Sequence, residues 1–486
     1  MIPTNNKTIR DNPLTLRNQL FLNTMNKTIL LITILATALA SQAFAEKPNV
    51  ILFFVDDMGY ADISPFGANP NRTPHLDRIA KEGVTLTSFY SGFASCTCSR
   101  ATILTGCYPK RMNIHGNFIP ESTTGLHPDE TTIADMLKDH GYATGMVGKW
   151  HLGHLRPFLP TSQGFDFFYG YPYSHDMWRY HPEERYQKRW GGLPLYRGDE
   201  VVDPNVVPRQ LETLSADLTD EAIQFIQSAN GKPFFLYYAH PFPHVPLYVT
   251  KAYKGKTGET IYADNVAELD HQLGRLMKEL ESSGARKNTL FIFTSDNGPW
   301  LSYGAHGGSA APLRGGKGQA FEGGFRVPGI ISWPAKIKGA KTDMVCGAID
   351  VMPTIAAATG AKLPRVKIDG KNLLPALTGQ DYQSPHEYLF YSINAVRSGK
   401  WKLLMPGRDA VFHTPGVNGH PAKPEGVTRT KYPLSLFDLD NDIGETQNLV
   451  EEYPEVVARL QKALDDHKSD LKTNARPLGG KRKTFK

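Results

Sequence analysis

Two pairs of oxygen-bearing side chains stand out by residue type and position. Asp56-Asp57 and Asp296-Asn297 each follow directly after a short apolar run. Carboxylate and amide oxygens, with no cysteine or histidine beside them, suit Ca²⁺ or Mg²⁺ better than zinc. One such pair alone is as well explained by a turn or loop cap. Two pairs in equivalent positions favour a site for one divalent cation, either Ca²⁺ or Mg²⁺.

A cysteine provides the second candidate for chemistry. The residues after Cys96 predict a short helix that Gly106 ends, so Cys96 would stand at a helix N-terminus. Free backbone amides and the helix dipole favour an anion there, and Arg100 adds a fixed positive charge. Such a cysteine is either a thiolate nucleophile or an ordinary buried residue. The local pattern therefore indicates an anion site without deciding the role of the thiol.

Several elements are predicted to position these residues. Residues 50–55, 234–239 and 290–294 are apolar throughout, which is typical of strands buried on both faces of a parallel sheet. Residues 131–140 and 262–283 predict helices, each followed by glycine. This alternation predicts an α/β fold with a doubly wound sheet. Ligands bind beyond the carboxyl ends of strands in such sheets, which is where the acidic residues fall.

The last quarter of the chain has a different character. It combines strand-like pieces, a helix and a basic tail, at residues 388–391, 401–404, 434–438, 453–468 and 481–483. We predict a catalytic domain over 46–380 and a smaller α+β subdomain with a basic tail over 381–486. The Pro- and Gly-rich stretch 406–433 is predicted to be a long loop that is mobile or forms part of a substrate cleft.

The N-terminal segment is typical of an export signal. Lys27, an apolar run over 29–40 and the Ala43-Phe44-Ala45 triplet precede Glu46. A single anchoring helix is the alternative, but the run is shorter than the roughly 20 residues that span a bilayer. We predict a signal peptide within 1–45, an upstream extension over 1–24, and a mature protein that starts near Glu46. It would be periplasmic or secreted, with no stable membrane span.

Composition excludes several classes of protein. The 486 residues are 40% hydrophobic and 21% charged, as in an ordinary globular protein. The net charge of +6 comes without a recognised nucleic-acid-binding motif, so no nucleic acid partner is expected. Four cysteines are too few for a disulfide scaffold in so long a chain, and the Cys96-x-Cys98 pair is a poor zinc motif. A bridge between Cys98 and Cys107 is left open.

The residues around Cys96 resemble a known signature. Cys96-x-x-Ser99-Arg100, followed by Leu-Thr-Gly, resembles the type I sulfatase motif, whose cysteine is oxidised to formylglycine by a maturation enzyme. The usual motif has Pro or Ala where Cys98 stands here, which leaves open which enzyme would mature it. The register still selects Cys96, because among the cysteines it is the one four residues before Arg100.

The resemblance extends over nearly all of the chain after Glu46. Further similar segments occur in family order at residues 49–59, 148–153, 243–246, 295–298, 316–324, 436–439 and 445–449. Residues 171–176 are similar to the branch that contains arylsulfatase A and N-acetylgalactosamine-6-sulfatase. The resemblance implies an alkaline-phosphatase-like fold, a mostly parallel sheet flanked by helices.

The resemblance also implies roles for individual residues. One Ca²⁺ would be held by Asp56, Asp57, Asp296, Asn297 and an oxygen of the modified Cys96. The charge of the sulfate would be neutralised by Arg100, Lys149 and Lys317. His244, with Lys317, would protonate the leaving oxygen, and His151 would accept a proton as sulfate leaves.

Substrate contacts are predicted in three places. Ser174 would contact the sulfate or the adjacent substrate by its likeness to the family, and His306 is a further candidate, although Ala305 replaces an Asp common in the branch. Trp178, Arg179 and His181 begin a stretch of rings and cations suited to sulfated sugars, or to a plain surface loop.

The predicted reaction is the release of sulfate from a sulfated carbohydrate or an aryl sulfate. The rival reaction is that of a phosphodiesterase or phosphonate monoester hydrolase on the same fold. The rival from another class is a non-catalytic protein that binds sulfated glycans, which would result if Cys96 were not matured.

Overall fold

The computed structural model describes residues 47–67, 73–379 and 381–480. The predicted signal peptide and the basic tail lie outside these residues. Within the described part of the chain, no helix has the length and apolar character needed to cross a membrane. The predicted domain boundary at residue 380 stays a prediction.

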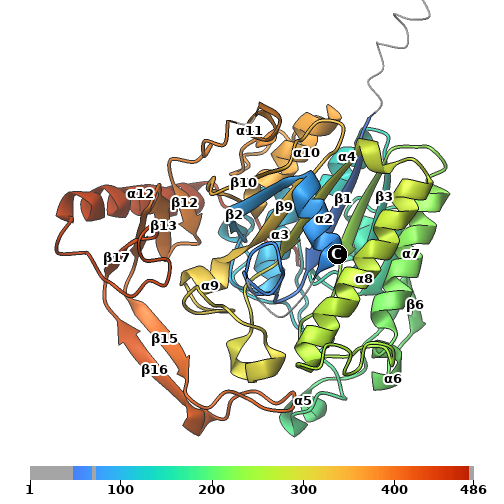
Figure 1. The fold of residues 1–486 in the computed structure, drawn as a ribbon, viewed down its shortest axis with the longest axis horizontal. Helices are drawn as coiled ribbons and strands as arrows, with labels where there is room; N and C mark the ends of the chain where they lie inside the picture. Colours follow the sequence, from blue (N-terminus) through green and yellow to red (C-terminus); the bar gives the residue numbers. More distant parts are fainter. Residues whose placement is uncertain (1–46, 68–72, 380, 481–486) are drawn as a thin grey trace, which may run out of the picture. The chain divides into compact units, whose positions relative to one another are not determined.

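A large mixed sheet forms the centre of the fold (Figure 1). Among the described residues it has 11 strands, in the order β10-β2-β9-β8-β1-β7-β3-β4-β5-β6, with β11 paired to β2. Their bounds are β1 Asn49–Val55, β2 Val84–Tyr90, β3 Ala143–Lys149, β4 Phe167–Tyr171, β5 Leu195–Arg197, β6 Glu200–Asp203, β7 Phe234–Ala239, β8 Thr289–Ser295, β9 Arg326–Ser332, β10 Ala340–Thr342 and β11 Cys346–Gly347.

The three strands predicted from apolar runs are confirmed as the middle of this sheet. β1 lies between β7 and β8 and is parallel to both. The sheet is antiparallel where β9 pairs with β2 and β8, and where β5 pairs with β4 and β6. The prediction of a mostly parallel sheet flanked by helices is therefore confirmed.

Helices cover both faces of the sheet (Figure 1), which explains why the central strands are apolar throughout. Alternate residues of β1 enter two different hydrophobic cores, one with α3, α4 and α10 and the other with α2, α7 and α8. The helix bounds are α2 Pro74–Glu82, α3 Cys96–Thr105, α4 Ile133–Asp139, α5 Glu184–Arg189, α6 Pro208–Leu211, α7 Leu214–Ser228, α8 Ile261–Ser282, α9 Glu322–Phe325, α10 Val351–Thr359, α11 Leu374–Gly379 and α12 Pro454–Thr473.

Local chemistry fixes the ends of the helices that matter for the site. Gly106 ends α3 in the left-handed conformation, with φ 68°, as its sequence position predicts. Thr132 and Asp135 form a capping box at the start of α4, and the Thr260 side chain accepts a hydrogen bond from the Ala263 amide at the start of α8.

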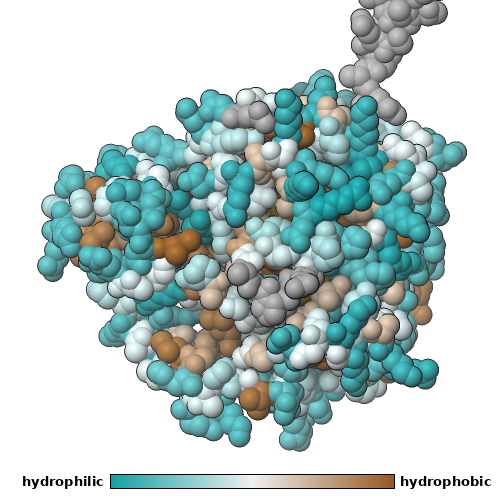
Figure 2. Space-filling view, viewed as in Figure 1, coloured by the Kyte–Doolittle hydropathy of each residue, from teal (hydrophilic) through white to brown (hydrophobic). Residues whose placement is uncertain are grey.

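The C-terminal part forms its own antiparallel sheet in the order β12-β13-β14-β17. Its strands are β12 Leu389–Tyr391, β13 Ala395–Ser398, β14 Trp401–Leu404 and β17 Ser435–Asp438. The helix α12 packs on this sheet through Leu460 and Leu464, in a small core with Val396, Leu403 and Leu436. Hydrophilic residues cover most of the face seen in Figure 2, and apolar residues gather there in small, separate patches.

One expectation needs correction, and one open question is answered. Residues 406–433 are not one long loop, because β15 Gly407–Phe412 and β16 Val427–Tyr432 pair as an antiparallel hairpin. The Pro and Gly residues that suggested a loop are concentrated in the segment between these strands. The bridge left open between Cys98 and Cys107 is absent: all four cysteines lie in the described residues and all are free and buried. Cys98 packs in the core under α3, whereas the Cys107 thiol faces Arg476.

Candidate active site

The two oxygen-bearing pairs meet because their strands are neighbours. Val55 at the end of β1 lies opposite Ser295 at the end of β8, so Asp56-Asp57 and Asp296-Asn297 leave the sheet side by side. The Asp57 amide donates a hydrogen bond to Asp296 Oδ1 at 3.1 Å. Asp57 itself has φ 62°, a strained conformation for a residue with a side chain.

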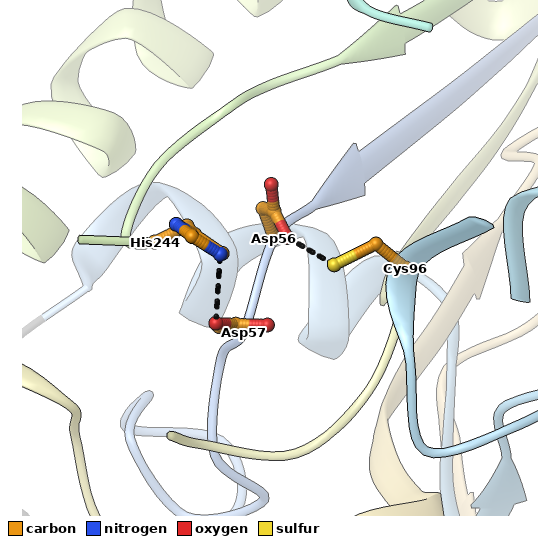
Figure 3. A group of neighbouring side chains, drawn as sticks. All are labelled: Asp56, Asp57, Cys96 and His244. Carbon is orange, nitrogen blue, oxygen red and sulfur yellow. Dashed lines mark hydrogen bonds and ion pairs between the residues drawn. The ribbon is translucent and has the colours of Figure 1, made fainter. Parts of the chain in front are cut away.

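Cys96 and His244 complete a compact group with the first pair (Figure 3). Ligand atoms of Asp56, Asp57, Cys96 and His244 all lie within 4.8 Å of one another. Cys96 Sγ is 3.5 Å from Asp56 Oδ1, and His244 Nε2 is 3.4 Å from Asp57 Oδ2. These residues come from the end of β1, the start of α3 and the segment after β7.

The donor set fits a hard cation. Asn297 Nδ2 donates to Asp57 Oδ1 at 2.7 Å, but the Asn297 Oδ1 atom is buried and no described residue donates a hydrogen bond to it. Burial raises the pKa of Asp57 to about 6 and that of Asp296 to about 7. Crowded buried carboxylates and an orphaned amide oxygen are stabilised together by a divalent cation. The four predicted oxygen ligands and Cys96 are thus brought to one place.

Three cations surround these carboxylates. Arg100, on α3, donates to Asp296 Oδ2 at 2.9 Å and to the Lys149 carbonyl at 2.7 Å. Lys149, at the end of β3, donates to Asp56 Oδ2 and to Ser174 Oγ, the latter at 3.1 Å. Lys317 Nζ donates to Asp57 Oδ2 at 2.8 Å. An anion that enters beside Cys96 would therefore meet fixed positive charges.

These cations set the charge state of Asp56. Burial alone would raise the pKa of this carboxyl, but Lys149, Arg100 and Lys317 hold it well below its usual range. Asp56 is therefore ionised and available as a ligand, even though it is completely buried.

His151 is arranged to accept a proton. Its Nε2 lies 2.8 Å from the Phe118 carbonyl, to which it donates, so Nδ1 carries the lone pair. Nδ1 is buried and has no partner among the described residues. Burial, with Lys149 and Arg100 nearby, lowers the pKa of His151 well below its usual value. The side chain is consequently neutral and has an acceptor free.

Sequence reasoning missed the residues that join His151 to the cysteine helix. The Thr97 amide donates to Asn117 Oδ1 at 3.0 Å, and Thr97 Oγ1 donates to the His151 carbonyl at 2.9 Å. The Phe118 amide donates to Thr97 Oγ1 at 3.1 Å. These bonds fasten the first turn of α3 to His151, and no local pattern marks Asn117 for this task.

Trp300 was also missed. Lys317 Nζ lies 4.4 Å from the centre of its ring, and the His244 ring lies 5.4 Å away. The tryptophan thus holds two of the predicted catalytic residues against one aromatic surface. Its place three residues after Asn297 is the one sequence signal that could have indicated it.

The predicted substrate-binding residues lie in different surroundings. Ser174 is buried and contacts Lys149 at the centre of the site. Trp178 is wholly buried in the core, and His181 packs edge-on against Tyr186, whereas Arg179 is exposed. His306 is half-buried, and its Nδ1 has no hydrogen-bond partner within residues 47–67, 73–379 and 381–480. The structure thus joins Ser174 to the catalytic cluster, and the roles of the other four stay predictions.

Comparisons with known proteins agree with this geometry. Residues 48–361 match the family described as "Sulfatase", and residues 383–483 match the "C-terminal region of aryl-sulfatase". The chain is 37% identical to arylsulfatase A of Bos taurus over 457 residues, which cover 87% of this chain and 88% of the relative. It is 34% identical to N-acetylgalactosamine-6-sulfatase of Canis lupus familiaris, over 91% of this chain and 90% of the relative.

A solved structure shares the whole architecture. The PsFucS1 sulfatase from Pseudoalteromonas sp. superposes with a TM-score of 0.80 and 28% sequence identity, covering 93% of this chain and 96% of that chain. The matched families span both the central sheet and the C-terminal sheet. The chain therefore belongs to the sulfatase family, the hydrolases of sulfuric esters.

Proposed function

We propose that this sulfatase removes sulfate from a sulfated carbohydrate, with one Ca²⁺ in its site and with Cys96 converted to formylglycine. The observation that carries the proposal is the position of Cys96. It stands at the start of α3, next to Asp56, amid Arg100, Lys149 and Lys317. An anionic ester is expected to bind where helix amides and fixed cations converge on one reactive residue.

The unmodified thiol is a poor nucleophile in this place. Burial raises the pKa of Cys96 well above its ordinary value, so the thiol is protonated at neutral pH. A formylglycine hydrate supplies two hydroxyls on one carbon, one to attack sulfur and one to allow sulfate to leave as the aldehyde re-forms. Because Cys96 is 1% exposed within α3, the maturation enzyme is expected to act before the chain folds.

The side chains of the site divide the remaining work. A calcium ion held by Asp56, Asp57, Asp296 and Asn297 would hold a sulfate oxygen and lower the pKa of a hydroxyl beside it. Arg100 and Lys149 neutralise charge that spreads over the sulfate oxygens in the transition state. His151 accepts a proton at its free Nδ1 atom as sulfate leaves.

Proton delivery to the leaving oxygen is assigned to Lys317 and His244 together. Burial lowers the pKa of His244 well below its usual value. Burial would also lower the pKa of Lys317, but the charge of Asp57 outweighs it and helps to raise this pKa well above its usual value. Lys317 is therefore the protonated member of the pair, and His244 orients the leaving oxygen beside it. Ser174, held by Lys149, is assigned to the sulfate or the sugar next to it.

A carbohydrate substrate is favoured over an aryl sulfate by two observations. One relative at 34% identity is named for N-acetylgalactosamine 6-sulfate. The stretch from Arg179 to Trp190 combines half-buried rings with exposed cations, including Arg179, as sugar sulfates require. With the export signal predicted at the N-terminus, these features favour a periplasmic or secreted enzyme that degrades sulfated polysaccharide.

The alternative functions, a phosphodiesterase or a phosphonate monoester hydrolase, have less support. Zinc-dependent phosphodiesterases on this fold would be expected to use Thr or Ser as nucleophile with extra His ligands, and the predicted ligands here bear oxygen. A non-catalytic glycan-binding protein would need no neutral His151 with a free acceptor atom. Sulfate ester hydrolysis accounts for all of these groups.

The test is mass spectrometry of the peptide that contains residue 96, combined with sulfate release. The wild-type protein should lose the thiol mass, gain an aldehyde and release sulfate from sulfated sugars. Cys96→Ala should lower turnover by at least about 10⁴-fold without loss of fold. The matched control is Cys98→Ala, which restores a residue usual in the family motif and should remain active. Turnover by protein that retains an intact Cys96 thiol would refute the proposal.

A further inference from the structure

The segment between β15 and β16 lies against the loop that borders the active site. The Gly416 and Ala422 amides donate to the Ser302 carbonyl at 2.9 and 2.7 Å, and the Ala422 amide also lies 3.2 Å from Ser302 Oγ. Ser302 belongs to a 3₁₀ turn, Leu301–His306, that follows directly after Trp300. Since Trp300 contacts both Lys317 and His244, the hairpin segment is tied to the wall of the catalytic site.

The same segment reaches α5 on its other side, as the orange-red connection from β15 and β16 shows (Figure 1). His420 Nδ1 lies 2.6 Å from Oε1 of Glu183, and Glu183 is the residue directly before α5. Between the two elements is a cleft of about 410 Å³, whose lining includes Glu183, Arg185, His420 and Lys423. Two segments that are more than 200 residues apart in sequence thus build one cleft.

The cleft carries positive charge that the protein does not neutralise. Within the described residues, neither Arg185 nor Lys423 has an ion-pair partner, and Glu183 is engaged by His420. Arg185 lies over the ring of Tyr186 at 4.6 Å, and Tyr186 stacks on Trp190 with centroids 4.8 Å apart. These rings hold Arg185 in place, and cations without an ion-pair partner suit a sugar that bears sulfate or carboxylate.

The segment between β15 and β16 is held in its conformation by its own backbone contacts. The His413 and Thr414 amides both donate to the Gly426 carbonyl, which closes its base. At Gly416 a Cβ atom would lie 1.8 Å from the His420 carbonyl oxygen, so a close approach that glycine alone permits holds the turn together. Binding in the cleft would therefore require little ordering of the chain.

We propose that this cleft is a second saccharide subsite, which binds an anionic sugar next to the sulfated unit held at Cys96. The inference rests on the proposed function and deepens it: the substrate is an oligosaccharide with at least two anionic units. His306 lies beside this segment, because its Nδ1 is 3.5 Å from the position that a Cβ at Gly419 would take. The C-terminal subdomain would then select the substrate, while the central sheet holds the chemistry.

The test compares substrates of different length on the matured full-length enzyme. The aryl sulfate probe is 4-methylumbelliferyl sulfate. The saccharide probes are size-fractionated tetrasaccharides, each compared with its sulfated monosaccharide, prepared from chondroitin sulfate, heparin, fucoidan and carrageenan. The wild type should prefer a tetrasaccharide to its monosaccharide in kcat/KM. In the double variant Arg185→Ala/Lys423→Ala, kcat/KM for that tetrasaccharide should fall about tenfold more than for the aryl sulfate, and the difference should shrink at high salt.

Lys431→Ala is the matched control, since Lys431 is an exposed lysine on β16 outside the cleft, and it should change neither value. The subsite would be overturned if the wild type cleaved no tetrasaccharide better than its monosaccharide. It would also be overturned if kcat/KM of the double variant fell equally for the tetrasaccharide and the aryl sulfate. Failure of the matured wild type to cleave any sulfate ester would instead overturn the proposed function, and the subsite with it.

Discussion

Two of the buried charge clusters among the described residues differ in what they leave unpaired. The strand-end cluster comprises Asp56, Asp57, Asp296, Asn297, Arg100, Lys149 and Lys317 at the edge of the central sheet. The subdomain cluster comprises Glu322, Glu445, Lys402, Arg397, Arg326, Tyr90 and Tyr391 between the central sheet and the C-terminal sheet. Both are buried, and both contain strongly shifted pKa values.

The charged groups of the subdomain cluster pair with one another. Glu322 accepts from Tyr90 at 2.7 Å, Tyr391 at 2.6 Å and Lys402 at 3.1 Å. Lys402 also pairs with Glu445 Oε1 at 2.8 Å, and Glu445 Oε2 accepts from the Glu322 amide at 2.7 Å. Glu445 Oε1 has no hydrogen bond among the described residues, but its ion pair with Lys402 neutralises it. Each carboxylate oxygen thus has a hydrogen-bond donor or an ion-pair partner, as expected of a cluster that fastens two parts of a fold.

The strand-end cluster leaves acceptor atoms free. In the part of the chain that the structure describes, Asn297 Oδ1 has no hydrogen-bond partner, and neither has Nδ1 of His151. Buried charge and shifted pKa values therefore do not by themselves distinguish an active site from a structural joint. The distinction lies in unpaired buried atoms that converge on one reactive residue, here Cys96.

The sharpest contrast is expected from Lys402→Met. Removal of this buried cation leaves Glu445 without an ion-pair partner among the described residues and leaves Glu322 paired with Arg326, so the free energy of unfolding should fall by about 3–5 kcal/mol. Chemical denaturation measures it, and kcat per folded molecule should stay close to that of the wild type. A stability loss below about 1 kcal/mol would show that the subdomain cluster is not a joint of this kind.

Removal of calcium should affect the other cluster. Chelation with EGTA should abolish sulfate release and lower the unfolding free energy by about 2.7 kcal/mol relative to a calcium concentration 100-fold above Kd. Differential scanning fluorimetry with Ca²⁺ or Mg²⁺ added back measures the effect, with Ca²⁺ restoring more. Because the wild type and Lys402→Met share the metal site, both should respond equally. An unchanged melting temperature and full activity after chelation would contradict the metal assignment.

The smallest effect is a pH dependence in the subdomain cluster. Burial raises the pKa of Glu445 to about 7. At pH values between the ordinary pKa of a glutamate and 7, the folded protein therefore holds a proton on Glu445 that the unfolded chain has lost. This contribution to stability is complete at low pH and disappears as the pH rises through 7, a loss of about 1 kcal/mol between pH 6 and pH 8. Glu445→Gln should remove this component, as equilibrium unfolding at several pH values can measure. An identical pH profile in the variant would exclude Glu445 as its source.

Much of the central fold could be predicted from sequence because its signals are local. The apolar runs that became β1, β7 and β8 are buried on both faces, so they read the same in sequence as in structure. The hairpin of β15 and β16 was missed for the opposite reason. β16 is mostly exposed, and the Pro- and Gly-rich residues beside it masked the strand pattern.

The candidate site divides in the same way. By itself, the sequence determined which residue types follow each buried strand and which cysteine starts a helix, because these properties depend on neighbours along the chain. Only the tertiary structure decided that Asn117 fastens the cysteine helix, that Trp300 supports Lys317, and that a C-terminal hairpin lines a cleft with α5. Such contacts join residues far apart in sequence, and their energies depend on geometry that no local pattern encodes.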